Sequence, residues 1–155
     1  MSDLDINVEM QQLREKQARM AEAAKNLFGR HFYDAMGRAT LLVMRSAQEA
    51  APVDTGRLRG SITPTVEMRA KEMLGVVGSN VIYAPFVEYG TRPHWPPPGA
   101  LATWARRHGV PEFVIARAIA RYGTKPQPYL GPALDDNWRE IQEILMEGLI
   151  KGMSF

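Results

Sequence analysis

The 155-residue chain contains no cysteine, so neither a disulfide bond nor a thiolate metal site can form. No apolar run approaches the roughly 18 residues of a membrane-spanning helix, and no charged start followed by an apolar run suggests a signal peptide. We therefore expect a soluble protein without membrane contact. The length predicts one domain, residues 1–155, large enough to bury a core.

The sequence also lacks the common motifs of catalysis and cofactor binding. It has no glycine-rich phosphate loop, nucleophile elbow or catalytic triad pattern, and its three histidines share no metal-ligand spacing. Asp54-Thr55-Gly56 matches the aspartic-protease triplet, but that chemistry needs two carboxylates that share a proton. Here Arg57 and Arg59 follow the acid, and neighbouring cations favour a fully ionised carboxylate. We therefore expect no enzyme activity, no cofactor and no metal.

Positive charge is concentrated in one part of the chain. The formal net charge is +2, whereas residues 92–125 contain six basic residues and one acid, so this segment carries +5 and the remainder −3. Two interpretations stay open: a solvated helical surface, or a patch that faces a polyanion or an acidic neighbour. The residues concerned are Arg92, Arg106, Arg107, Arg117, Arg121 and Lys125, with Glu112 as the acid.

Two helical segments are predicted before residue 50. Residues 6–27 carry apolar side chains every seven positions, which fits a coiled coil or a helix that docks on a neighbouring subunit. Residues 32–49 form a second apolar helix, and Gly29 and Gly37 weaken the region around its start.

A helix end and a tight turn are predicted next. Pro52 ends the helical region, because its ring removes a backbone donor and restricts the residue before it. In the turn, we expect Gly56 to adopt positive φ and the Asp54 side chain to accept a hydrogen bond from the backbone two residues on. Arg57-Leu58-Arg59 then reads as the start of a strand, with both arginines on the outer face.

Three short strands are predicted over residues 60–67, 73–77 and 81–87. Their short separators favour an antiparallel meander. Pro64 marks the first strand as an edge or a bulge, and an unpaired edge is a docking site for another subunit.

The second half of the chain reads as a proline-rich linker, two short helices and a final helix. The two helices, residues 100–108 and 112–122, have the outline of a helix-turn-helix. Because only Arg117 and Arg121 of the second helix could contact DNA, a packing hairpin is favoured, and a sequence-specific regulator stays as an alternative. The final helix should begin near Pro132 and form a wall of the core through Leu134, Trp138, Ile141, Leu145 and Leu149. We also expect Tyr83, Phe86 and Tyr89 to lie in the core or on a strand face.

Three pieces of the sequence, taken in this order, carry a family resemblance. Motif 1 is Ala51-Pro52-Val53-Asp54-Thr55-Gly56-Arg57-Leu58-Arg59-Gly60-Ser61-Ile62. Motif 2 is Tyr83-Ala84-Pro85-Phe86-Val87-Glu88-Tyr89-Gly90-Thr91, and motif 3 is Pro126-Gln127-Pro128-Tyr129-Leu130-Gly131-Pro132-Ala133-Leu134. They resemble the tail-completion, or head–tail joining, proteins of long-tailed bacteriophages. The resemblance covers residues 39–150, with an insertion at 92–125.

The resemblance implies a structural virion protein that completes the head-proximal end of the tail and joins it to the head at the neck. The implied assembly is a homo-oligomeric ring around the DNA channel, beside a head-closure (stopper) protein, a tail terminator or the tail tube. The protein would pass from the host cytoplasm into the virion. A tail terminator or head-closure protein of the same neck is the alternative within this class.

The expected fold is α+β: a small antiparallel sheet flanked by a long N-terminal helical region and a C-terminal helix, with a helical-hairpin insertion. Its segments are helical residues 1–50, a β-meander at 51–91, the insertion at 92–125 and the last helix within 126–155.

The resemblance also implies structural or assembly roles for particular residues. Within the motifs these are Asp54, Gly56, Arg57, Arg59, Tyr83, Glu88, Gly90, Thr91, Pro128, Leu130 and Pro132. It suggests that Glu88 pairs with Arg57 or Arg59 in the same or an adjacent subunit. The insertion offers residues that would face the DNA channel or a neighbouring subunit: Arg106, Arg107, Arg117, Arg121 and Lys125. Any contact with genomic DNA would be non-specific.

Overall fold

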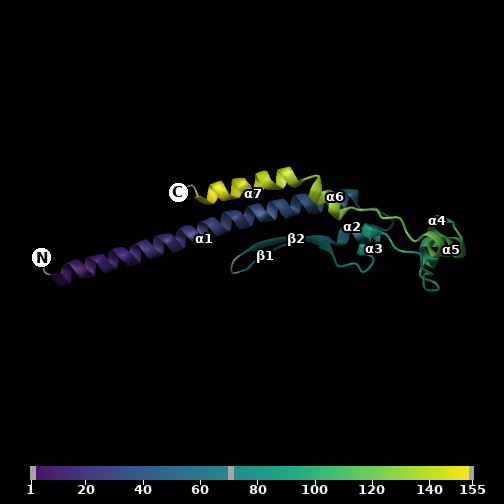
Figure 1. Ribbon diagram of the computed structural model, residues 1–155, viewed down its shortest axis with the longest axis horizontal. Helices are drawn as coiled ribbons and strands as arrows, with labels where there is room; N and C mark the ends of the chain where they lie inside the picture. The colour runs from purple at the N-terminus through teal and green to yellow at the C-terminus, as the bar shows by residue number, and fades with distance from the viewer. Residues whose placement is uncertain (1–2, 70–71, 154–155) are drawn as a thin grey trace. The chain divides into compact units, whose positions relative to one another are not determined.

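The computed structural model describes residues 3–69 and 72–153, with the side chains of residues 14–20, 29–69 and 72–153. Helices and one two-stranded sheet make up this part of the chain, so the predicted α+β class is confirmed (Figure 1). The elements are α1 (Asp3–Ala50), α2 (Arg57–Ser61), β1 (Ile62–Met68), β2 (Met73–Ser79), α3 (Ala84–Tyr89), α4 (Ala102–His108), α5 (Glu112–Tyr122), α6 (Leu130–Asp135) and α7 (Trp138–Met153).

The chain divides into two compact units. Unit 1 comprises Met1–Leu42, Pro64–Val76 and Asn137–Phe155, and unit 2 comprises Val43–Thr63 and Val77–Asp136. In the described residues, no helix combines the length and the apolar character that crossing a bilayer requires.

Helix α1 is continuous where two helical segments were predicted. A Cβ added at Gly29 or Gly37 would meet no atom within 4 Å, so both positions lie in open space and neither distorts the helix. The helix ends at Ala50, which confirms the prediction that Pro52 ends the helical region. The side chains of the seven-residue repeat in residues 6–27 lie largely outside the described residues, so a coiled coil there stays a prediction.

In unit 1, α1 packs against α7 on one side and against the β1–β2 hairpin on another (Figure 1). Gly148 of α7 lies against Ala35 of α1, and an added Cβ would also stand 3.1 Å from the carbonyl oxygen of His31. A Cβ on Gly75 of β2 would lie 2.7 Å from the Cγ2 atom of Thr40 in α1. Both glycines are therefore required by the close approach of these elements.

The predicted apolar stripe of the last helix is only partly buried. Ile141 is 6% exposed, but Trp138 is 54% exposed and Leu134 is 45% exposed, so the prediction that these two belong to the core is wrong. The helix is interrupted, since α6 ends at Asp135 and α7 begins at Trp138. The stripe therefore does not run along one regular helix, and its helical spacing no longer places all five side chains on one face.

The third predicted strand is wrong, and its residues form a turn followed by α3. Pro85 occupies the first turn of this helix, where its missing N–H has no intrahelical partner to lose. Gly90 ends the helix with φ 71°. The alternation of apolar residues in 81–87 is therefore not a strand pattern, and the sheet contains β1 and β2.

The start of the first predicted strand is also wrong, because Arg57-Leu58-Arg59 lies in α2. Leu58 is buried and both arginines are exposed, as expected, although the reason is helical geometry rather than strand alternation. Pro64 lies within β1 as predicted, and in a two-stranded sheet each described strand has one edge without a partner strand.

The two helices of the insertion are confirmed as α4 and α5. Gly109 ends α4 with φ 67° and Gly123 ends α5 with φ 71°, both in the left-handed region that glycine tolerates. The backbone N–H of Leu101 donates to Oε1 of Glu112 at 3.3 Å, which links the start of α4 to the start of α5. Ala105 is the buried residue of α4.

Candidate assembly site

A buried carboxylate, that of Glu88 in α3, holds the start of α6. Glu88 is 6% exposed, and its Oε2 atom accepts hydrogen bonds from the backbone N–H groups of Tyr129 (2.8 Å) and Leu130 (3.0 Å). Its Oε1 atom accepts one from Gly131 at 2.9 Å. The first N–H groups of a helix have no intrahelical partner, and the local N-cap residue of α6 provides no side-chain acceptor. Motif 2 therefore caps the helix that begins in motif 3.

The ionised form of Glu88 is stabilised by these contacts. Burial raises the pKa of its carboxyl, but the three backbone hydrogen bonds together lower the pKa further, so that it lies below its ordinary value. Within the chain, backbone amides thus take the place of Arg57 or Arg59, the partners that were expected. Among the described residues, the carboxylate of Glu88 makes its hydrogen bonds to backbone amides and forms no ion pair with Arg57 or Arg59, and a pair with an arginine of an adjacent subunit stays a prediction.

Two further contacts hold motifs 2 and 3 side by side. The backbone N–H of Gln127 donates to the carbonyl oxygen of Val87 at 2.8 Å. Thr91 and Thr124 form an isolated antiparallel bridge, in which the N–H of Thr91 donates to the carbonyl oxygen of Thr124 at 3.1 Å. Gly90, with φ 71°, brings the chain into this bridge. We call the contacts between residues 87–91 and 124–131 the motif junction.

Tyr129 is the central buried residue of the motif junction, and sequence reasoning assigned it no role. It is 0% exposed, and in the described residues its hydroxyl has no hydrogen-bond partner. Burial, with smaller effects from Glu88 and Tyr83, raises the pKa of this hydroxyl. The aromatic residue directly before Leu130 is part of the motif 3 resemblance, but nothing in the sequence alone indicated that its side chain would be fully buried. Of the predicted motif 3 residues, Pro128 is exposed, and Leu130 and Pro132 are half-buried in α6.

Motif 1 is attached to α4 of the insertion. Gly56 has φ 77°, which confirms the predicted turn. The Asp54 carboxylate accepts a hydrogen bond from the guanidinium of Arg107 and lies 3.3 Å from Nε2 of His108. The expected local hydrogen bond of Asp54 is thus replaced by contacts to α4, and Arg107 has an acidic partner within its own chain.

Motifs 1 and 2 meet at a surface groove in unit 2 of about 560 Å³. Arg57 of motif 1 and Tyr83 of motif 2 both line this groove. Nearby, the hydroxyls of Ser61 and Ser79 lie 2.7 Å apart and join the end of α2 to the end of β2. The structure therefore brings all three motifs together within unit 2.

An apolar surface lies beside the motif junction. Ile82 is 89% exposed, Tyr89 80%, Phe86 56% and Tyr83 41%, so the prediction that the three aromatic residues lie in the core or on a strand face is wrong. Phe86 and Tyr89 are three positions apart on α3 and therefore share one side of that helix, and Ile82 and Tyr83 lie in the turn directly before it. We call Ile82, Tyr83, Phe86 and Tyr89 the aromatic face.

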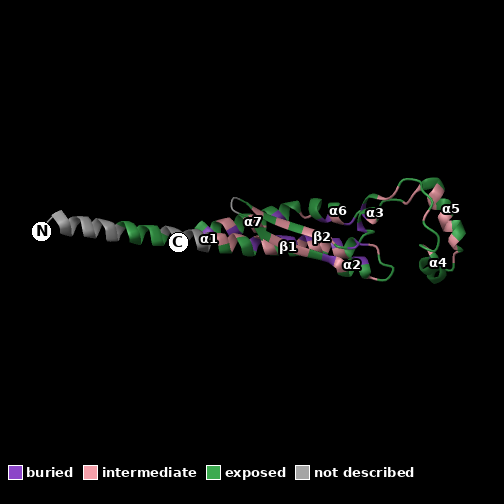
Figure 2. Cartoon of the chain, turned by 90° about the horizontal axis from the view of Figure 1, so that it is seen from below, coloured by how far each residue is buried: buried purple, intermediate pink, exposed green. Residues whose placement is uncertain are grey.

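The basic residues of the insertion lie at the surface. Arg106, Arg117, Arg121 and Lys125 are exposed, and no residue of α5 is buried (Figure 2). In the part of the chain that the structure describes, no group of three or more His, Cys, Asp or Glu side chains could hold a metal ion.

The chain was compared with known proteins. A family model described as "Bacteriophage HK97-gp10, putative tail-component" matches residues 11–90, slightly more than half of the chain and including motifs 1 and 2 up to Gly90. No curated protein and no solved structure matches the chain. Motif 3 and the insertion lie outside the matched residues. The chain belongs to the HK97-gp10-like family, and it is thus a tail-related structural protein of bacteriophages that acts in the virion beside other tail and neck proteins.

Proposed function

We propose that this protein completes the head-proximal end of the tail and joins the tail to the head at the neck, as a homo-oligomeric ring. Its family membership supports a tail-related role, and the three motifs support the more specific assignment through their resemblance to tail-completion proteins. The aromatic face is the observation that carries the proposal.

The aromatic face suits a surface that is covered in an assembly. Monomeric proteins rarely expose a large contiguous apolar surface, and aromatic anchors dominate the energetics of protein interfaces. Tyr89 and Ile82 are 80% and 89% exposed, yet Glu88, between them in sequence, is buried and fixed by hydrogen bonds to residues 129–131. A rigid support beneath an exposed apolar surface lowers the ordering cost of binding, because the surface is already in its bound shape.

The proposed role requires no catalysis, and we propose that the protein is not an enzyme. The one residue with a catalytic signature, Asp54, is engaged by Arg107 and His108. An aspartic-protease dyad needs a second carboxylate that shares a proton with the first, whereas the side chains in contact with Asp54 are those of an arginine and a histidine.

Deletion of the gene in a phage that encodes this chain tests the role. We expect electron micrographs of lysates to show filled heads and tails of normal length that remain unjoined, and purified protein added to such lysates should restore joined particles. Tails of abnormal length would instead identify a tail terminator. Heads that lose their DNA would identify a head-closure protein, and joined particles in the absence of the protein would refute all three roles.

Surface variants test whether the aromatic face is the joining surface. Ile82→Ser combined with Tyr89→Ser should leave the urea midpoint of the purified protein nearly unchanged, because both side chains are exposed. It should greatly reduce the yield of joined particles in complementation. Val53→Ser combined with Met68→Ser is the matched control, since these side chains are also 54% and 62% exposed. Equal joining by both double variants would contradict the assignment of this face.

A further inference from the structure

The insertion presents cations that have no acidic partner in the described chain. The single acid of residues 92–125, Glu112, accepts the backbone N–H of Leu101, and of the six basic residues only Arg107 makes an ion pair in the described structure. Because a neighbouring carboxylate reduces the attraction of a cation for a distant anion, the other five basic residues of the insertion remain available to attract an anion.

Four of these cations lie on α5 or directly beside the bridge between Thr91 and Thr124. Arg117 and Arg121 stand at i and i+4 on α5, so they share one exposed face of the helix. Arg92 and Lys125 directly follow the two bridged threonines, and the backbone N–H of His94 donates to the carbonyl oxygen of Ile119 at 3.3 Å. We call Arg92, Arg117, Arg121 and Lys125 the basic face.

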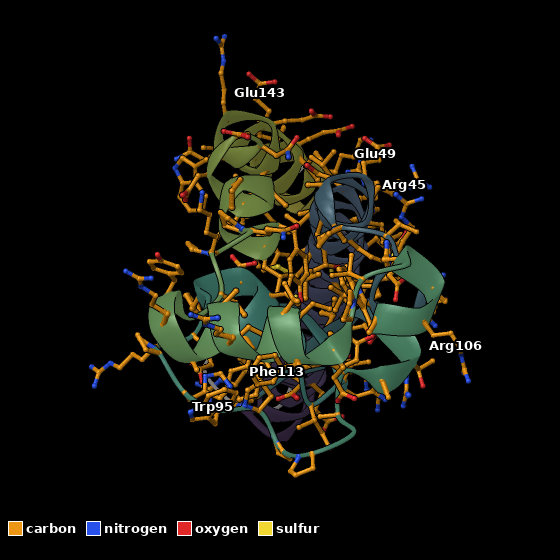
Figure 3. The ribbon with its side chains drawn as sticks, turned by 90° about the vertical axis from the view of Figure 1, so that its right-hand side faces the viewer. Arg45, Glu49, Trp95, Arg106, Phe113 and Glu143 are labelled. Carbon is orange, nitrogen blue, oxygen red and sulfur yellow. The ribbon has the colours of Figure 1, made fainter. Side chains whose placement is uncertain are left out.

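The aromatic side chains around the basic face have partners inside the insertion. The rings of Trp95 and Phe113 are 6.4 Å apart, and Figure 3 shows them close together, with Arg106 extending elsewhere. The guanidinium of Arg121 lies 5.1 Å from the ring centre of Tyr122, a cation–π arrangement that orients it. All three rings are also largely exposed, Trp95 at 62%, Phe113 at 66% and Tyr122 at 70%, so bases of a single strand could stack on them, and a test of this surface must compare single-stranded with duplex DNA.

The exposed side chains of α5 favour contacts to phosphate over recognition of bases. Its exposed positions are Phe113, Val114, Arg117, Ala118, Arg121 and Tyr122. They include no asparagine, glutamine, serine or threonine, the neutral side chains that read base edges. Arginines on one helical face can still contact successive phosphates, which carry charge but no sequence information.

We propose that the basic face binds the phosphate backbone of duplex DNA without sequence preference. This goes beyond the joining role and does not depend on ring formation, because the four cations belong to one unit of one chain. In a phage neck, such a surface would hold DNA by charge while allowing it to slide, since contacts to phosphate are equivalent at every base pair.

Fluorescence anisotropy with purified full-length protein tests the proposal. The probes are two labelled 30-base-pair duplexes of unrelated sequence and a 30-nucleotide single strand, each titrated over a series of salt concentrations. The test variant is Arg117→Gln with Arg121→Gln. The matched control is Arg30→Gln with Arg45→Gln, which makes the same change of net charge at exposed positions of α1. Urea unfolding of each variant checks that the fold is retained.

We expect wild-type protein to bind both duplexes with equal affinity and to lose affinity steeply as salt rises. The test variant should weaken duplex binding about tenfold or more at low salt and flatten the salt dependence by about two charge contacts, whereas the control should retain the wild-type slope. Retained binding by the test variant, an equal loss in the control, or no binding by wild type would each overturn the proposal.

Three further outcomes would also overturn it, and each points to a different partner. Preference for one duplex sequence would favour a helix-turn-helix regulator. Tighter binding of the single strand would favour base stacking. If poly-glutamate displaces the duplex at a lower concentration of negative charges than unlabelled DNA does, an acidic surface of a neighbouring protein is the favoured partner.

Discussion

The Oε2 atom of Glu88 accepts a hydrogen bond from the backbone N–H of Tyr129 at 2.8 Å, across 41 positions of sequence. This contact joins α3, which carries the aromatic face, to the first turn of α6. The proposed joining surface therefore depends on a residue that does not itself belong to it.

Glu88→Gln should destabilise the protein by about 2 kcal/mol, because an amide NH₂ group would replace one carboxylate oxygen opposite backbone donors, and hydrogen bonds to a charged acceptor are stronger than neutral ones. Urea denaturation at pH 7 measures the change. Glu143→Gln is the control, since the Glu143 side chain is 66% exposed and its pairing with Arg139 is worth little. Equal midpoints for the two variants would show that the cap on α6 contributes nothing.

The same carboxylate should make stability depend on pH. The pKa of Glu88 is lowered in the folded state, so its contribution is complete above the ordinary glutamate pKa of 4.5 and is lost as pH falls through the folded value. The pKa of Glu147 is also lowered, by Lys151 and Arg38. The informative quantity is therefore the difference between wild type and Glu88→Gln. The difference between their urea midpoints should become smaller as pH falls below 4.5, and a difference that does not change with pH would contradict this role.

The same substitution at two helical glycines should have opposite effects. Gly148→Ala should cost about 1–3 kcal/mol, because the added Cβ would overlap Ala35 on α1. Gly37→Ala should instead stabilise by about 0.5–1 kcal/mol, because alanine favours helix and a Cβ there meets no atom within 4 Å. Thermal unfolding of both variants beside wild type measures the two signs. A stabilising Gly148→Ala would mean that α7 does not pack closely on α1.

Tyr129→Phe should leave stability unchanged or raise it by about 1 kcal/mol. The buried Tyr129 hydroxyl has no hydrogen-bond partner in the described structure, so its removal relieves a desolvation cost and retains the packing of the ring. Chemical denaturation gives the result. A loss of more than about 1 kcal/mol would reveal a partner for this hydroxyl, such as an ordered water.

Trp138→Ala should change stability by less than about 1 kcal/mol, although tryptophan is the largest side chain of its helix. Trp138 is 54% exposed, whereas Ile141 is 6% exposed, so Ile141→Ala should cost about 2–4 kcal/mol. Urea midpoints of the two variants make the comparison. A larger cost for the tryptophan variant would restore its sequence-based assignment to the core.

Local features of the fold were predictable from the sequence because their causes are local. Pro52 ends α1, Gly56 makes the turn, and Gly109 and Gly123 end the two helices of the insertion, each through its own backbone preference. The prediction of a strand at 81–87 was wrong because it relied on the alternation of apolar residues. Pro85, which suits the first turn of a helix, was the better indicator.

The partners within the candidate site were not predictable in the same way. Three unpaired amides at the start of α6 require an acceptor, but nothing in motif 3 indicates that Glu88 supplies it from 41 positions away. The exposure of Tyr89 could not be inferred either, since its apolar character is equally suited to a core and to an interface.

The bridge between Thr91 and Thr124 has a consequence for how this chain can vary. It brings the two ends of residues 92–123 next to each other, so the connection between motifs 2 and 3 can be closed by a two-residue Asn-Gly turn. The helices α4 and α5 therefore enter and leave this part of the fold at one place, and α4 is also held to motif 1 by the contacts of Arg107 and His108 with Asp54. Because Glu88 and the amides of Tyr129, Leu130 and Gly131 all lie outside residues 92–123, a change in the length or charge of this segment should leave the cap on α6 in place.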